Sequence, residues 1–188
     1  MHRLLVGTAT LGAVLLAAAP ADARPASKGF FSEAGLGVTG LLPPHQGAVK
    51  AGPTVDLQLG YDLFSWLSLS VHVAASSHEA TVPPPPEGEW LQLYRADAGG
   101  RMGFRIDSVA LFAEGGLGAA YISSNLLGKV GITDPGERFG VAFRAGGGLE
   151  YQVLNRHYAF GVAGDWLLVP DFDALSAIQA RVFLRYTY

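Results

Sequence analysis

The stretch Tyr-Arg-Ala-Asp-Ala-Gly-Gly-Arg-Met-Gly-Phe-Arg, residues 94–105, decides the fold class of this chain. Its even-numbered positions, from Tyr94 to Phe104, carry apolar side chains or glycine, and its odd-numbered positions carry charged side chains or glycine. A period of two places alternate side chains on opposite faces of a β-strand, whereas an amphipathic helix needs a period of 3.6. The stretch therefore predicts a strand with one apolar face and one charged face.

Seven further segments of the chain alternate in the same way. They cover approximately residues 33–39, 54–61, 67–74, 111–121, 141–152, 158–166 and 178–188. The connections alternate between tight turns, at 62–65, 106–108 and 154–157, and longer segments, at 42–50, 77–90, 122–138 and 169–176. Short turns on one side and long loops on the other are typical of bacterial outer-membrane barrels. The sequence predicts an all-β, eight-stranded antiparallel up-and-down transmembrane β-barrel.

The N-terminal residues have the features of a secretory signal peptide. Arg3 is followed by an apolar stretch, 4–19, and then by the small-x-small site Ala21-Asp22-Ala23. The apolar stretch is shorter than the roughly 20 residues that a membrane-spanning helix needs. We expect cleavage after residue 23, a short segment over 24–28, and the barrel over 29–188.

Composition excludes several classes of protein. The chain has 188 residues, no cysteine and a net charge of −3, and only three of its 13 basic residues are lysine. Disulfides, thiolate metal sites and a lipidated cysteine are therefore absent. The net charge argues against a nucleic-acid partner. No cofactor, metal or catalytic site is predicted.

The polar face is predicted to line the inside of the barrel. An arginine facing lipid costs roughly 2–4 kcal/mol at the bilayer midplane, and paired charges in a narrow lumen suit the planar guanidinium group of arginine. We therefore expect an ionic network in the lumen. Its members are Glu33, Asp56, His72, Arg95, Asp97, Arg101, Arg105, Glu114, Arg144, Glu150, Asp165, Arg181 and Arg185.

Aromatic residues gather near the segment ends on the apolar face, as expected for belts at the two membrane boundaries. The predicted girdle residues are Tyr61, Trp66, Phe104, Tyr121, Tyr151, Tyr158, Trp166, Tyr186 and Tyr188. The turn positions also predict ion pairs between neighbouring strands. These pairs are Asp56–His72, Arg101–Glu114, Arg144–Asp165 and Glu33–Arg185.

Over residues 29–188 the chain resembles the small eight-stranded outer-membrane barrels of the OmpA-transmembrane and OmpX-like class. The C-terminal run of Ile178, Ala180, Val182, Leu184, Tyr186 and Tyr188 ends on an aromatic residue. In that class such an ending looks like the signal read by the barrel assembly machinery. The resemblance implies a bacterial outer-membrane location, and as partners the outer-membrane lipid and that machinery.

The leading functional hypothesis is a structural or interaction protein with a charge-plugged lumen, outward loops and an unidentified extracellular or envelope partner. The alternatives are a soluble lipocalin-like barrel for an apolar ligand, a narrow pore, and a lipid-modifying enzyme. An enzyme would need a base beside a nucleophile. His72 and Ser76 lie more than about 12 Å apart along an extended strand, and Ser76 and His78 are expected at an unfixed loop edge. We therefore expect that the protein is not an enzyme.

Overall fold

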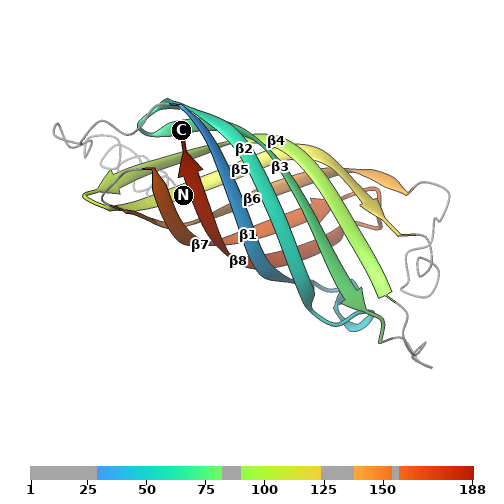
Figure 1. The fold of residues 1–188 in the computed structure, drawn as a ribbon. Coiled ribbons are helices and arrows are strands. Elements are labelled where there is room, and N and C mark those ends of the chain that lie inside the picture. The colour runs from blue at the N-terminus through green and yellow to red at the C-terminus, as the bar shows by residue number, and fades with distance from the viewer. Residues whose placement is uncertain (1–28, 82–89, 124–137, 154–156) are drawn as a thin grey trace, which may run out of the picture.

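A computed structural model describes residues 29–81, 90–123, 138–153 and 157–188. It confirms the predicted fold. Eight antiparallel strands form one closed barrel in the order β1 to β8, and β1 pairs with β8 (Figure 1). The strands are β1 (Phe30–Leu41), β2 (Gly52–Phe64), β3 (Leu67–Glu79), β4 (Trp90–Ile106), β5 (Val109–Ile122), β6 (Phe139–Gln152), β7 (Tyr158–Val169) and β8 (Leu175–Thr187). The predicted signal peptide, 1–23, and the segment 24–28 lie outside the described residues.

The connections differ in detail from the predicted ones. The first tight turn consists of residues 65–66 and not 62–65, because β2 continues to Phe64 through a register shift after Asp62. The second consists of Asp107 and Ser108, and Asp107 has a φ of 53°, a conformation that aspartate tolerates better than most residues. Part of the third turn, 154–156, lies outside the described residues.

The connections at the opposite end are also partly shorter than predicted. β3 continues to Glu79, so residues 77–79 belong to a strand, and the β7–β8 connection consists of residues 170–174 in place of 169–176. Residues 82–89 of the predicted 77–90 connection and residues 124–137 of the predicted 122–138 connection lie outside the described residues. The β1–β2 connection contains a short 3-10 helix, His45–Gly47. In the described part of the chain, no helix is long and apolar enough to cross a membrane.

Burial alternates with the sequence along every strand. The outward face exposes large apolar side chains, such as Leu59 at 64% and Val182 at 58%, while the inward face buries charged ones. This is the reverse of a water-soluble barrel, in which the apolar face fills the interior. The inward face also needs small residues, because a Cβ atom at Gly118 would lie 1.9 Å from the carbonyl oxygen of Ala96.

Candidate functional site

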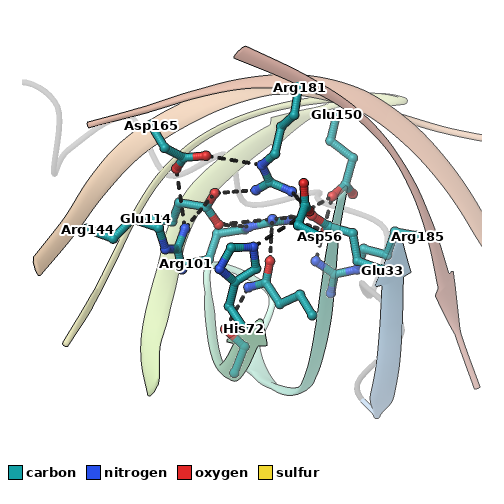
Figure 2. A network of polar contacts seen from close by, with 12 residues as sticks. Glu33, Asp56, His72, Arg101, Glu114, Arg144, Glu150, Asp165, Arg181 and Arg185 are labelled. Atoms are coloured by element: carbon teal, nitrogen blue, oxygen red, sulfur yellow. Dashed lines mark hydrogen bonds and ion pairs between the residues drawn. The ribbon is translucent and has the colours of Figure 1, made fainter. Parts of the chain in front are cut away.

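The centre of the lumen holds a cluster of buried arginines and carboxylates (Figure 2). Arg181, on β8, makes four ion pairs. Its partners are Glu33 at 2.7 Å, Asp56 at 3.1 Å, Glu114 at 2.5 Å and Asp165 at 3.1 Å. These acids come from β1, β2, β5 and β7, so that one guanidinium group ties together strands from around the barrel.

Arg101 and Arg144 complete the central cluster. Arg101 pairs with Glu33 and Glu114, each at 3.0 Å, and with Glu150 at 3.4 Å. Arg144 pairs with Asp97 and Glu114, each at 3.1 Å, and with Asp165 at 3.3 Å. Since Glu114 contacts all three arginines and every member is nearly fully buried, the charges are compensated by one another and not by bulk water.

His72 and Arg95 lie on the side of this cluster that faces the long connections. His72 is fully buried, with Nδ1 3.2 Å from Asp97 and Nε2 3.6 Å from Asp56. Arg95 donates a hydrogen bond to Gln179 and makes no ion pair within the described residues. Its Nε atom is buried without a hydrogen-bond partner.

The remaining charges lie toward the short turns. Arg185 contacts both oxygens of Asp62, at 2.6 and 2.7 Å, and Arg105 lies 3.1 Å from Glu150. Glu150 joins this group to the central cluster through Arg101, and phenylalanine rings pack against the arginines on both sides of that link. The guanidinium of Arg101 lies 4.1 Å from the ring centre of Phe112, and that of Arg185 lies 3.7 Å from that of Phe31. Such cation–π contacts stabilise desolvated arginines.

The predicted pairs compare with the structure as follows. Arg101 stands opposite Glu114 in the β4–β5 register, and Arg144 reaches Asp165 diagonally. His72 stands opposite Gln58 and not Asp56, because the first turn lies later than predicted, but the predicted contact with Asp56 is still made diagonally, at 3.6 Å. Glu33 does stand opposite Arg185, but its ion pairs go to Arg101 and Arg181.

Some lumen residues were missed from the sequence. We predicted Asp62 to lie in a turn. It directly follows the outward residue Tyr61, however, so the alternation of side chains along the strand already placed it on the inward face. Gln58 and Gln179 also lie on the inward face, and each makes a hydrogen bond with a charged member of the network. Eight of the nine predicted girdle residues point outward, whereas Trp66 lies in the first turn and also lines a cavity at the short-turn end. Several contact aromatic neighbours, as Tyr158 does Tyr186 with 4.9 Å between the ring centres. Their role at a membrane boundary stays a prediction.

A second layer, which we call the apolar cap, closes the lumen at the end with the long connections. It was not predicted. The side chains that point inward there are aliphatic or aromatic and almost fully buried. The cap consists of Leu41, Val49, Ala80, Leu91, Leu93, Ala120, Ile122, Ala142, Leu167, Val169, Phe172, Leu175 and Ala177.

The β1–β2 connection lies across this cap and holds it in place. Its Val49 bridges to Ala80 after β3, and Leu42 donates a backbone hydrogen bond to Ser176 at 2.8 Å. His45 is buried, with Nε2 3.2 Å from the carbonyl oxygen of Asp173. One connection therefore ties the end of β3 to the β7–β8 turn.

The prediction that Ser76 and His78 lie at an unfixed loop edge is wrong. Both are on β3, buried, with Ser76 Oγ 2.9 Å from His78 Nε2 and His78 Nδ1 3.1 Å from the carbonyl oxygen of Lys50. A nucleophile beside a base is the geometry of an activated serine. Both side chains point into the barrel, however, where His78 stands opposite the cap residue Leu91, and both are buried there. Among the described residues, no group of three or more potential metal ligands occurs.

The short-turn end has a small cavity of about 60 Å³, lined by residues that include Trp66, Arg101 and Arg185. It has room for a few water molecules. Along the axis of the described barrel, the lumen thus contains a small polar cavity at the short-turn end, then the ionic cluster, and then the apolar cap at the opposite end.

Comparison with known proteins identifies the same architecture. The family model of the outer membrane protein β-barrel domain matches residues 8–183. Neisserial surface protein A has a similar structure at 14% identity, with a TM-score of 0.62 over 85% of this chain and 97% of that one. OprG from Pseudomonas aeruginosa gives 0.58 at 11% identity over 89% and 99% of the two chains.

The outer membrane enzyme PagL is a third similar structure, at 19% identity, with a TM-score of 0.51 over 84% of this chain and 99% of that one. No curated protein is similar to the chain in sequence. Since each identity is below 25%, these likenesses show a shared fold and carry no specific activity to this chain.

Proposed function

Because the chain belongs to the family of outer membrane protein β-barrel domains, we propose that it is an outer-membrane barrel with a closed lumen and a structural or interaction role. The observation that carries this proposal is the filled lumen. A conducting pore needs a continuous water path, and eight strands enclose an interior just wide enough for side chains to fill. Here the four carboxylates around Arg181 and the apolar cap occupy that interior.

The proposal includes the route and the surroundings of the protein. We propose export by the signal peptide over 1–23, insertion by the barrel assembly machinery, and contact of the outward apolar face with membrane lipid. The even number of strands puts both termini on the short-turn side, which in outer-membrane barrels is the periplasmic side. The long connections would then face outward and meet an extracellular or envelope partner.

The alternatives have less support. A soluble lipocalin-like barrel does not fit a family of outer-membrane proteins or an outward face of exposed leucine and valine. A lipid-modifying enzyme would need its serine and base where substrate can reach them. Ser76 is 7% exposed and His78 is 0% exposed, inside the barrel, so we propose no catalysis by this pair.

Electrical conductance tests the closed lumen. The purified barrel would be reconstituted into planar bilayers, with correct folding shown by a heat-dependent shift of mobility on SDS gels. We expect no stepwise current above that of the bare bilayer. Reproducible ohmic steps from a sample that shows the shift would overturn the closed lumen and favour a narrow pore.

Labelling of single cysteines tests the orientation, because the chain has no cysteine of its own. Lys50→Cys lies in the β1–β2 connection, and Asp107→Cys lies in the β4–β5 turn. A membrane-impermeant maleimide should label the first variant on intact cells and the second only after the outer membrane is permeabilised. The opposite pattern would mean that the barrel is inserted the other way.

A further inference from the structure

The outward surface has two apolar hollows on either side of β1. The larger has a volume of about 590 Å³ and extends from β5 across to β1, and the smaller, of about 400 Å³, extends from β8 to β3. Ala34 and Leu184 line both. The hollows therefore meet at the place where the first and last strands close the barrel, which Figure 1 shows as β1 beside β8.

Small residues on β1 create this shape. Two small residues, Ser32 and Ala34, point outward between longer side chains. Ala34 stands between Leu57 on β2 and Leu184 on β8, and Ser32 stands between Leu59 and Tyr186 on the same strands. The walls of both hollows are mainly aliphatic and aromatic. Glu33 and Glu150 also border them, but their carboxylates are buried in the lumen, so they contribute backbone there.

Tyrosines stand at the short-turn edge of each hollow. Tyr151 borders the larger one and Tyr186 borders the smaller one. A tyrosine with an apolar body and a polar tip favours the boundary between the hydrocarbon and the headgroups. The hollows thus extend from this boundary into the hydrocarbon layer, in the leaflet that faces the short turns.

We propose that these two hollows form a binding site for the acyl chains of a glycerophospholipid in the periplasmic leaflet. The proposal rests on the membrane insertion and orientation proposed above. The hollows are continuous with the lipid-facing surface, so hydrocarbon and not water is the medium that reaches them. A chain seated in a concave site contacts walls on several sides, and each added contact contributes dispersion energy that a convex surface does not offer. The seated chain therefore exchanges more slowly than lipid elsewhere around the barrel.

Ala34→Leu is the variant that fills the site, because its longer side chain would project where the two hollows meet. Ala113→Leu is the matched control, since Ala113 is an outward, exposed alanine on β5 that lines neither hollow. Ala34→Val is a second, smaller filling variant for use if the leucine variant folds poorly. Folding of each variant is checked by the heat-dependent mobility shift.

The measurement is paramagnetic relaxation of methyl groups in lipid nanodiscs. The discs consist of phosphatidylcholine with a small fraction of phosphatidylglycerol that carries a nitroxide at the middle of one acyl chain. We expect the methyls of Leu57 and Leu184 to relax about fivefold faster than that of Leu117, an outward residue that borders neither hollow, which corresponds to a preference of about 1 kcal/mol. Ala34→Leu should abolish the excess, and Ala113→Leu should leave it unchanged.

Equal relaxation of all outward methyls would overturn the lipid site. Weaker relaxation of Leu57 and Leu184 than of Leu117 would also overturn it, because it would mean that a second copy of the barrel covers the hollows and excludes lipid. If the sample inserts into the membrane and does not conduct, either result overturns only the lipid site, and the proposal of a closed barrel still stands. Failure to insert would instead contradict the proposed function itself.

Discussion

Replacing Arg181 by methionine is the perturbation that bears most directly on the ionic cluster. The variant keeps a long side chain but removes the cation that four buried carboxylates share. Glu114 keeps Arg101 and Arg144, and Asp165 keeps Arg144. Asp56 loses its arginine and keeps only His72 at 3.6 Å and the amide of Gln179 at 3.2 Å. Breaking a buried ion pair by removing one partner costs about 3–5 kcal/mol.

That cost is a large part of a typical unfolding free energy of about 5–15 kcal/mol. The assay is equilibrium unfolding by denaturant in lipid vesicles, followed by tryptophan fluorescence. The control is Arg105→Met, at the short-turn end. Arg105 is 23% exposed, and its partner Glu150 also contacts Arg101 and Arg185, so we expect a loss of unfolding free energy of about 1 kcal/mol or less.

The pH dependence adds a second criterion. As the pH falls, Asp56, Glu114 and Asp165 take up protons and lose the charge that the variant leaves uncompensated, so the difference in unfolding free energy between wild type and Arg181→Met should narrow. The reasoning would be refuted if Arg181→Met destabilised the barrel no more than Arg105→Met does at neutral pH.

Three further substitutions, two of them paired with a control substitution, are expected to have distinct effects in the same unfolding assay. Gly118→Ala should lower the unfolding free energy by about 1–3 kcal/mol, because the new Cβ would overlap the backbone of β4. Gly164→Ala is its control and should change the unfolding free energy by less than about 0.5 kcal/mol, because the nearest atom to its Cβ is 3.9 Å away. Equal effects of the two substitutions would contradict this. Phe112→Ala should cost about 3–5 kcal/mol by leaving a cavity beside Arg101, and a loss below about 1 kcal/mol would show that the ring does not support the cluster. Ser76→Ala should cost about 1–3 kcal/mol by leaving His78 Nε2 without its partner, whereas the adjacent outward Ser77→Ala should be near neutral, and no difference between them would mean that the buried hydrogen bond contributes nothing.

The fold was predictable from the sequence because one physical rule governs every strand. The period of two in the sequence assigns the strands. The free-energy cost of placing arginine in lipid then assigns the charged face to the inside of the barrel. Register was predictable where a turn is tight and regular, as at Asp107, which correctly set Arg101 opposite Glu114. It failed for Asp56 and His72, because the register shift after Asp62 moves the turn toward the C-terminus.

The apolar cap was missed for a different reason. Leu91 and Leu93 have the same parity as Arg95, so the sequence did contain apolar residues in the inward phase. We assumed one character for each face along the whole strand, although the inward face changes from charged to apolar where strands continue beyond the ionic cluster. Contacts between connections, such as that of His45 with Asp173, depend on loop geometry that alternation does not encode.

The central claim is that outward side chains face lipid while inward ones face a closed interior, and neighbouring residues of one strand test it most directly. In lipid nanodiscs, nuclear Overhauser effects would be measured from the methyls of β3 to lipid chains and to bulk water. The account predicts that the methyls of Leu69, Val71 and Val73 contact lipid chains and that the buried methyl of Ala74 contacts neither. Contact of Ala74 with bulk water, or of Val71 and Val73 with no lipid, would contradict it.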